Sequence, residues 1–179
     1  MRKIVIAALG AGLLLAPLAG SASAAEPGGS PSSFASPASG SRVATGLAAG
    51  TGLAATCWAP AQKADIAWKS STSAIQAGDA YCNYDRTYVF GMQADGNLVL
   101  YKMDGTAIWA SGTYNHPGAY ALMQADGNFV VYDANGSALW STGTWWAGSG
   151  SVFAFQNDGN LVLYKADHTA VWASNTRGR

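Results

Sequence analysis

The sequence predicts an all-β domain over residues 57–179, and three observations support this fold class. The pattern Gln-x-Asp-x-Asn-x-Val-x-Tyr occurs three times with its spacing intact. Apolar and polar side chains alternate after each Asp-Gly pair, as they do along a half-buried strand. Turn-forming pairs recur every few residues, and no stretch of this region has a sustained helical period.

The three copies of the pattern start at Gln93, Gln124 and Gln156, so they are 31 and 32 residues apart (124 − 93 = 31 and 156 − 124 = 32). Repetition at such a period indicates a fold built from equivalent units. The Asp-Gly pair in each copy predicts a hairpin turn, because glycine readily takes the positive φ of a tight turn. Each copy is therefore expected to end one strand at the Gln and to begin the next at the Asn.

The strand period also predicts which way the side chains of the first unit point. Leu98 and Leu100 are expected on an apolar core face, with Asn97, Val99 and Tyr101 on an opposite, polar face.

A second turn is predicted later in each unit, at Asp104-Gly105, Asn135-Gly136 and Asp167-His168. The third lacks the glycine, so we expect it to be the least regular.

Residues 1–24 predict a secretory signal peptide, and we expect the protein to be extracellular after cleavage near Ala24. Arg2 and Lys3 form a short basic start, an apolar run follows, and residues 22–24 are a small-residue cleavage site. A retained anchor helix is the less favoured alternative, because the run is too short to span a bilayer. No other stretch is long and apolar enough, so no membrane insertion is expected.

Residues 25–56 are rich in Ser, Pro, Gly and Ala, with Glu26 and Arg42 as the only charged side chains. Such a composition buries too little apolar surface to offset its ordering entropy, which indicates a flexible linker. A cleaved pro-segment is the alternative. Without the signal peptide the chain has 10 − 2 = 8 basic and 10 acidic side chains, and no basic patch for nucleic acid.

Cys57 and Cys82 are the only cysteines, and an even pair in an exported chain predicts a disulfide. Closing a loop of this length stabilises the fold by about 3 kcal/mol in the chain-entropy model. Between the two cysteines, residues 73–79 read as one more strand and turn. We expect this strand to belong to the first unit, as the counterpart of the strands that residues 118–123 and 151–156 form in the later units.

A Trp follows each motif Tyr at the same distance, and the three motifs with this Trp resemble the bulb-type, or monocot mannose-binding, lectin family over about residues 65–176. The resemblance implies a β-prism II, in which three four-stranded sheets surround a pseudo-threefold axis. It also implies that three tryptophans meet in the middle: Trp109, Trp140 and Trp172.

The resemblance further implies one mannose site in each motif. The Gln, Asp, Asn and Tyr would hydrogen-bond the sugar, the Val would pack on its apolar carbons, and the Asp and Asn would read the axial 2-hydroxyl. The implied sites are site 1 (Gln93, Asp95, Asn97, Val99, Tyr101), site 2 (Gln124, Asp126, Asn128, Val130, Tyr132) and site 3 (Gln156, Asp158, Asn160, Val162, Tyr164).

Independently of the resemblance, the chemistry of these residues suits sugar binding. Neighbouring hydroxyls both donate and accept, so a site needs amide, carboxylate and phenol groups close together. The alternative is that Asp and Asn serve only the hairpin turn. Turn chemistry does not explain why Gln, Val and Tyr recur at fixed offsets, so we favour sugar binding.

Two further groups of residues lie outside the motifs. Trp145 and Trp146 are adjacent, so in a strand they would face opposite ways, and we expect one in the core and the other exposed. No chemistry is assigned to the loop of residues 114–117.

An enzyme is not expected. His116 and His168 lie in separate turns, no metal-ligand spacing is present, and neither a metal nor a cofactor is predicted. Asp95 and Asp126 could suggest a glycosidase pair, but they are equivalent members of a repeat, whereas a catalytic pair needs unlike environments.

The favoured hypothesis is a secreted mannose-specific lectin with three shallow sites that binds mannose-containing glycans multivalently. Under this hypothesis the lectin could act against competing cells, as a bacteriocin does, because some bacterial relatives of the family resemble bacteriocins. It could also form a homodimer. The alternative is a structural or protein-binding prism with vestigial sugar sites.

Overall fold

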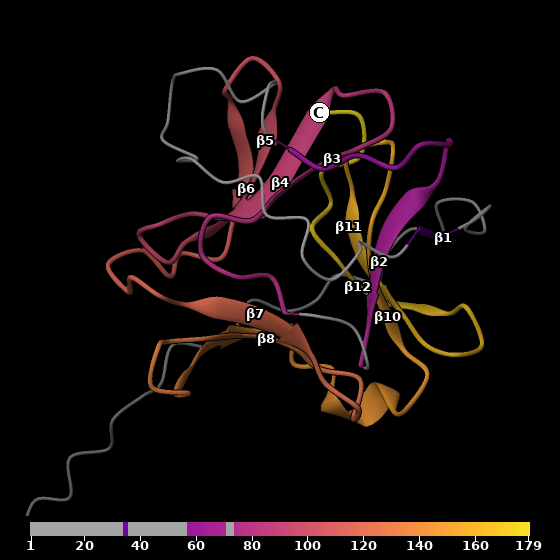
Figure 1. Cartoon of the computed structure of the whole chain (residues 1–179). Coiled ribbons are helices and arrows are strands. Elements are labelled where there is room, and N and C mark those ends of the chain that lie inside the picture. The colour runs from indigo at the N-terminus through magenta and orange to yellow at the C-terminus, as the bar shows by residue number, and fades with distance from the viewer. Residues whose placement is uncertain (1–33, 36–56, 71–73) are drawn as a thin grey trace, which may run out of the picture.

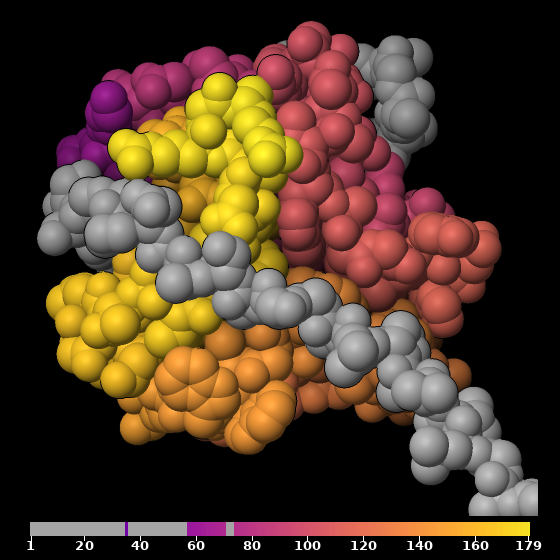
Figure 2. Space-filling view, turned by 180° about the vertical axis from the view of Figure 1, so that it is seen from behind, coloured from indigo at the N-terminus to yellow at the C-terminus, as the bar shows by residue number. Residues whose placement is uncertain are grey.

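The computed structural model describes residues 34–35, 57–70 and 74–179, so the predicted signal peptide and most of the predicted linker lie outside the described residues. The described part is nearly all-β, as predicted, with three sheets arranged around a common centre (Figure 1). Seen from the opposite side, the red, orange and yellow parts of the chain lie in three sectors (Figure 2). None of the helices in the described part is long and apolar enough to cross a membrane.

Each sheet contains a three-stranded antiparallel meander formed by one repeat unit. In sheet B the meander is β4 (Tyr88–Met92), β5 (Leu98–Lys102) and β6 (Ala107–Ala110). In sheet C it is β7 (Tyr120–Met123), β8 (Phe129–Tyr132) and β9 (Ala138–Ser141). In sheet A it is β10 (Val152–Phe155), β11 (Leu161–Tyr164) and β12 (Ala170–Ala173).

The segment before the first repeat adds one more partner to each sheet. β2 (Asp65–Lys69) pairs with β10 in sheet A, Ile75 bridges to Ala121 of β7 in sheet C, and β3 (Ala80–Cys82) pairs with β4 in sheet B. A short strand β1 (Phe34–Ala35), from the predicted linker, pairs in parallel with β2. The chain before the repeats therefore ties the three sheets together.

This arrangement corrects one expectation. Ile75 does not pair with the first unit, because it bridges to Ala121 of β7 in the second unit, and only the end of the segment, Gly78 and Asp79, hydrogen-bonds Met92 of the first unit. The counterpart of β7 and β10 in the first unit is β4, which lies after Cys82. The strand pattern alone could not show this, since it carries no information about which edge a strand joins.

The core lies between the sheets and is filled by the inward-facing side chains of the central strands. Leu98 and Leu100 are buried there as predicted, and so are their counterparts on the other sheets, Phe129, Val131, Leu161 and Leu163. Burying each such side chain contributes about 1.5–3 kcal/mol. The three repeat tryptophans meet as the resemblance implied, with ring centroids 5.4 Å apart for Trp109 and Trp140, 6.0 Å for Trp109 and Trp172, and 5.8 Å for Trp140 and Trp172.

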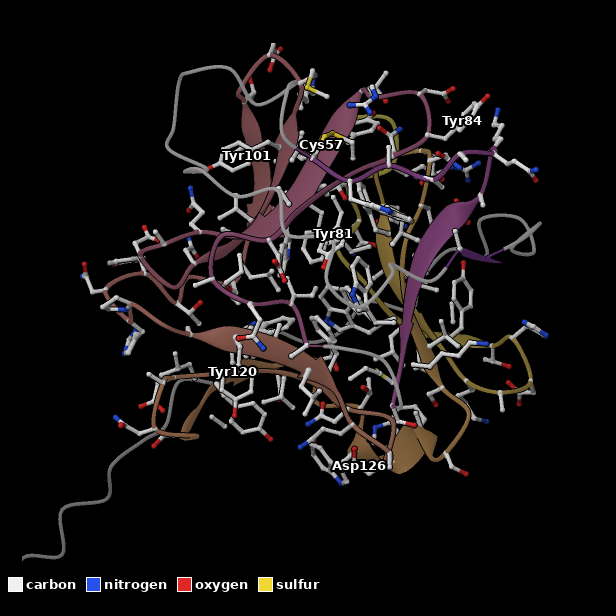
Figure 3. All side chains as sticks on the ribbon, in the orientation of Figure 1. Cys57, Tyr81, Tyr84, Tyr101, Tyr120 and Asp126 are labelled. Atoms are coloured by element: carbon white, nitrogen blue, oxygen red, sulfur yellow. A yellow bond between two sulfur atoms is a disulfide. The ribbon has the colours of Figure 1, made fainter. Side chains whose placement is uncertain are left out.

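The opposite face of sheet B is less polar than expected. Val99 and Tyr101 do point away from the main core, but they are only 2% and 6% exposed. They pack in a second apolar cluster with Val89 and with Cys57 and Cys82, which form the predicted disulfide. Figure 3 shows Cys57 and Tyr101 in the same upper part of the molecule.

The third late turn is as regular as the others, so the expectation about it is wrong. In all three turns the same two backbone hydrogen bonds form, here from Lys165 to Thr169 and from His168 to Lys165. His168 takes a φ of 66°, the left-handed conformation that glycine has in the other two turns. Asp167 Oδ1 accepts the backbone N–H of Thr169 at 3.0 Å, and this bond lowers the pKa of Asp167 to about 2.

Candidate functional site

Each predicted site is built on the first hairpin of its unit. In site 1 the backbone N–H of Gln93 donates to the carbonyl of Asn97, and that of Gly96 donates to the carbonyl of Gln93. The Asp95 Oδ1 accepts the backbone N–H of Asn97 at 2.9 Å, which closes the turn from the side-chain side. The corresponding bonds are present in sites 2 and 3.

The Gln and Tyr of each site are joined across the hairpin. Gln93 Nε2 donates to the Tyr101 hydroxyl at 2.9 Å, Gln156 Nε2 to the Tyr164 hydroxyl at 3.1 Å, and Gln124 Nε2 to the Tyr132 hydroxyl. A β-bulge directly before each Tyr shifts the strand register at the same point in all three sheets. The structure thus brings together the Gln and Tyr that the sequence assigned to one site.

The Asn of each site holds a loop that the sequence reading missed. Asn97 Oδ1 accepts the Ser111 hydroxyl at 3.2 Å, the Gly112 backbone N–H at 3.0 Å and the Thr113 backbone N–H at 3.1 Å. The Thr113 hydroxyl in turn donates to the Gly96 carbonyl at 2.7 Å. The side-chain oxygen of the Asn is therefore committed to the fold.

The same loop anchor occurs at the other two sites. It consists of a Ser or Thr two residues after the repeat Trp and a Thr two residues later, namely Ser111 and Thr113, Thr142 and Thr144, and Ser174 and Thr176. The fixed spacing from the Trp was visible in the sequence and could have identified these residues.

Each loop returns to its site a few residues later. The backbone N–H of His116 donates to the Asp95 carbonyl at 2.9 Å, that of Gly148 to the Asp126 carbonyl at 2.8 Å, and that of Gly178 to the Asp158 carbonyl at 2.8 Å. The residues between the Thr and this second bond are consequently held beside the site.

The groups that the fold does not use are the ones available to a ligand. In sites 1 and 2, Oδ2 of the Asp and Nδ2 of the Asn have no hydrogen-bond partner within the described part of the chain. Burial raises the pKa of Tyr101 and of Tyr164, so both phenols stay protonated and can donate. A site therefore offers a carboxylate acceptor, an amide donor and a hydroxyl donor.

The valines lie between these polar groups but present little surface. Val99, Val130 and Val162 are 2–3% exposed. The apolar contact that they could give a ligand is therefore small, and the polar groups around them dominate the site.

The three sites differ in how open they are. Gln93, Gln156, Tyr101 and Tyr164 are buried, whereas Gln124 and Tyr132 of site 2 are half-buried. The Tyr132 ring stacks on Tyr120, with centroids 5.5 Å apart. Site 2 is thus the most accessible of the three.

Site 3 carries extra charge. The Arg177 Nε lies 3.2 Å from Asp158 Oδ2, the oxygen that the Asp of the other sites leaves unpaired. Asp65 of β2 accepts the backbone N–H of the neighbouring Asn157 at 2.9 Å, and burial raises the pKa of Asp65. A ligand at site 3 would have to compete with Arg177 for the carboxylate.

The expectation for Trp145 and Trp146 is wrong, because both are exposed. They lie in a short 3-10 helix, η2 (Trp145–Ala147), and not in a strand. Ala147 is the buried residue of this helix and packs on the main core. Figure 3 shows Asp126 of site 2 beside this turn of ribbon.

The described residues contain no group of three or more His, Cys, Asp or Glu side chains that could hold a metal ion. Asp95 and Asp126, weighed as a glycosidase pair, occupy equivalent turns of two different sheets. The geometry therefore presents three copies of one polar site.

Comparison with known proteins identifies the architecture. No protein-family model matches the chain, and no curated protein matches it. Among solved structures, a monomeric monocot mannose-binding lectin from Gastrodia elata is 34% identical, with a TM-score of 0.55 over 62% of this chain and 97% of that one. The Marasmius oreades lectin is 30% identical, with a TM-score of 0.55 over 69% of this chain and 98% of that one.

A lectin from Allium sativum is 37% identical, with a TM-score of 0.50 over 60% of this chain and 96% of that one. The three sheets around a shared tryptophan centre are a β-prism II, as the resemblance implied. By fold and sequence likeness, the chain belongs to the family of monocot mannose-binding lectins.

Proposed function

We propose that the protein is a secreted mannose-specific lectin that binds sugar through the three motif sites. The observation that carries this proposal is the set of polar atoms left over from the fold at the hairpins of sites 1 and 2: an Asp Oδ2 acceptor, an Asn Nδ2 donor and a Tyr hydroxyl. Because each anchoring bond fixes the other atom of the same side chain, these groups are preorganised. Preorganised groups bind without the entropic cost of ordering flexible side chains.

We propose that the Asp and Asn of a site address one hydroxyl together. A sugar hydroxyl can donate to the Asp95 carboxylate while it accepts from the Asn97 amide, since a hydroxyl does both. If this is the 2-hydroxyl, an axial orientation fits and the equatorial one of glucose does not. A lost hydrogen bond that strands its partner costs about 1–3 kcal/mol, so glucose should bind at least several-fold more weakly.

The three sites lie on different sheets, so one small sugar cannot contact two of them. Each site alone is shallow and should bind weakly. Useful affinity then comes from several sites meeting one mannose-rich surface, where linkage adds about 10²- to 10⁴-fold when the geometry permits. A mannose-coated competing cell is one such surface.

The alternative is a prism whose sugar sites are vestigial. The pairing of Arg177 with Asp158 supports it for site 3, because that carboxylate already has a partner. Nothing comparable holds the Asp of site 2 within the described residues.

The decisive experiment replaces each site Asp by Asn and titrates methyl α-mannoside. Asp95→Asn, Asp126→Asn and Asp158→Asn keep the oxygen that closes the turn and remove the negatively charged acceptor. Each single variant should lose one binding site by calorimetry, and the triple variant should lose them all. Asp133→Asn is the matched control, since Asp133 closes a turn outside the sites.

Two results would contradict the proposal. If the triple variant still binds mannoside, the motif is not the binding site. If the wild-type protein binds mannoside and glucoside equally, the assignment of Asp and Asn to the 2-hydroxyl is wrong.

A further inference from the structure

The largest apolar side chains exposed on the described surface lie beside site 2. The chain has seven tryptophans, and five of them pack in or against the main core. The other two, Trp145 and Trp146, are 64% and 59% exposed. Exposed apolar surface of this kind usually marks a place where something binds.

The two tryptophans are held in place by the site itself. Before them, Thr144 donates its hydroxyl to the Gly127 carbonyl at 2.8 Å and its backbone N–H to Asn128 Oδ1 at 3.1 Å. After them, Gly148 donates its backbone N–H to the Asp126 carbonyl at 2.8 Å. The η2 turn that carries both rings is therefore fixed at each end to the Asp-Gly-Asn turn of site 2.

The turn is also packed tightly from below. Ala147 is buried in the main core, and a Cβ added at Gly127 would lie 2.9 Å from the Ala147 Cβ. The Trp145 ring lies over its own loop, with Cζ3 3.8 Å from the position of a Cβ at Gly143. The exposed rings thus rest on a rigid support next to the most open site.

We propose that Trp145, with Trp146 beside it, forms a second subsite of site 2 that stacks on the next ring of a mannose-containing oligosaccharide. The inference rests on the proposed function of site 2. A sugar ring presents a face of C–H groups that suits an aromatic ring, and a flat, rigid side chain provides large contact area at low entropic cost.

Two other occupants fit the surface less well. Tryptophans bury about 150–250 Å² each when fully covered, so this pair falls short of the roughly 800 Å² per partner of a stable protein interface. An anionic membrane is disfavoured by charge, because Asp126 lies beside the rings. A short glycan already bound at site 2 needs only this small area.

The other two sites have different residues at the equivalent position, directly after the anchoring Thr. Site 1 has Tyr114, which is 59% exposed, and site 3 has Arg177, which is paired with Asp158. The motif residues of the three sites are the same, so this loop residue adds a difference in chemistry to the differences in burial between the sites. We expect a preference for oligosaccharide over monosaccharide that is largest at site 2 and smallest at site 3.

The test is a site-resolved NMR titration of the full chain with methyl α-mannoside and with α-linked mannobiosides and mannotriose. The backbone amides of Gly96, Gly127 and Gly159 report the three sites separately, because each lies in the Asp-Gly turn of one site. In the wild-type protein the ratio of mannotriose to mannoside affinity at site 2 should exceed that at site 3 by about 2- to 10-fold, the range of an aromatic stacking contact. Trp145→Ala should lower the ratio at site 2 toward that of site 3, and Trp145→Phe should retain part of it.

The controls separate this inference from the function on which it rests. Tyr114→Ala should change the ratio of mannotriose to mannoside affinity only at site 1. Native dispersion of the amide signals of Trp145→Ala shows that this variant is folded. If mannoside fails to bind at all, the proposed function is wrong. If mannoside binds and the ratio at site 2 is unchanged by Trp145→Ala and by Trp146→Ala, the second subsite is wrong. If sedimentation shows a dimer for the wild-type protein and a monomer for these variants, Trp145 and Trp146 form an interface between two copies of the chain, and the second subsite is wrong.

Discussion

The side chain of Asn97 serves the fold and the site with different atoms, and substitution can separate the two roles. Its Oδ1 accepts three hydrogen bonds from the loop of residues 111–113, whereas its Nδ2 has no hydrogen-bond partner among the described residues. Asn97→Ala removes both atoms. Asn97→Asp keeps an acceptor oxygen and removes only the donor.

The structure sets the expected magnitudes. A hydrogen bond within a protein contributes about 1 kcal/mol net, so the three bonds lost in Asn97→Ala should lower the free energy of unfolding by about 3 kcal/mol. For a domain of this size that corresponds to a fall in Tm of about 10 °C. Asn97→Asp should stay within about 1 kcal/mol of wild type, since it keeps the acceptor oxygen and solvent at the exposed Asp95 screens the repulsion between the two charges.

The assay combines urea unfolding with mannoside titration. Both variants should lose binding at site 1, but only Asn97→Ala should lose stability. Asn128→Ala provides a graded comparison, because Asn128 Oδ1 accepts two such bonds, and it should lose about 2 kcal/mol. If Asn97→Ala unfolds within about 0.5 kcal/mol of wild type, or if both substitutions at Asn97 cost the same, the loop-anchor argument is wrong.

Three further predictions concern the turns and one half-buried carboxyl. His168→Gly should raise the free energy of unfolding by about 0.5–1 kcal/mol, because glycine adopts the left-handed conformation of this position without the steric strain of a side chain. A loss of stability in urea unfolding would contradict this. Gly127→Ala should cost about 1–3 kcal/mol more than Gly136→Ala: both have positive φ, but only at Gly127 would a Cβ meet backbone, at 2.8 Å. Equal stabilities of these two variants would refute that. Burial raises the pKa of Asp65 above 3.8, so the stability that its protonated form gives below this value is lost as the pH rises through the folded pKa. Asp65→Asn should therefore gain stability relative to wild type as the pH rises above 3.8, and parallel pH profiles would exclude the effect.

The periodic features of the sequence predicted most of the fold. Spacing, local turn chemistry and the resemblance predicted the three meanders, their turns and the tryptophan centre. The disulfide was predicted from the single pair of cysteines in a chain expected to be exported. Two failures have a common physical cause. Ile75 joins β7 and not the first unit, and η2 is a helix turn and not a strand, because both depend on which distant edge or loop is free to receive the segment.

The candidate sites show a similar limit. The motif identified the residues, but it could not show which atom of each side chain the fold consumes. Asn97 Oδ1 is bound by a loop that begins more than ten residues later in the chain, and Arg177 reaches Asp158 from the loop after the last strand. Contacts of this kind depend on the folded arrangement, so residue spacing within a motif does not encode them.

The commitment of half of each side chain to the fold bears on whether the sites are vestigial. For the hairpin alone, Asp126 and Asn128 each need one side-chain oxygen, which either Asp or Asn could supply. The later turns show what happens where only the fold is served: the equivalent position is Asp104, Asn135 or Asp167, and the following glycine becomes His168 in the third turn. All three sites nevertheless have Asp first and Asn third, and at sites 1 and 2 this leaves both a carboxylate acceptor and an amide donor that the turn does not use. Turn chemistry gives no reason for that choice, whereas a hydroxyl that must donate to one group and accept from the other does.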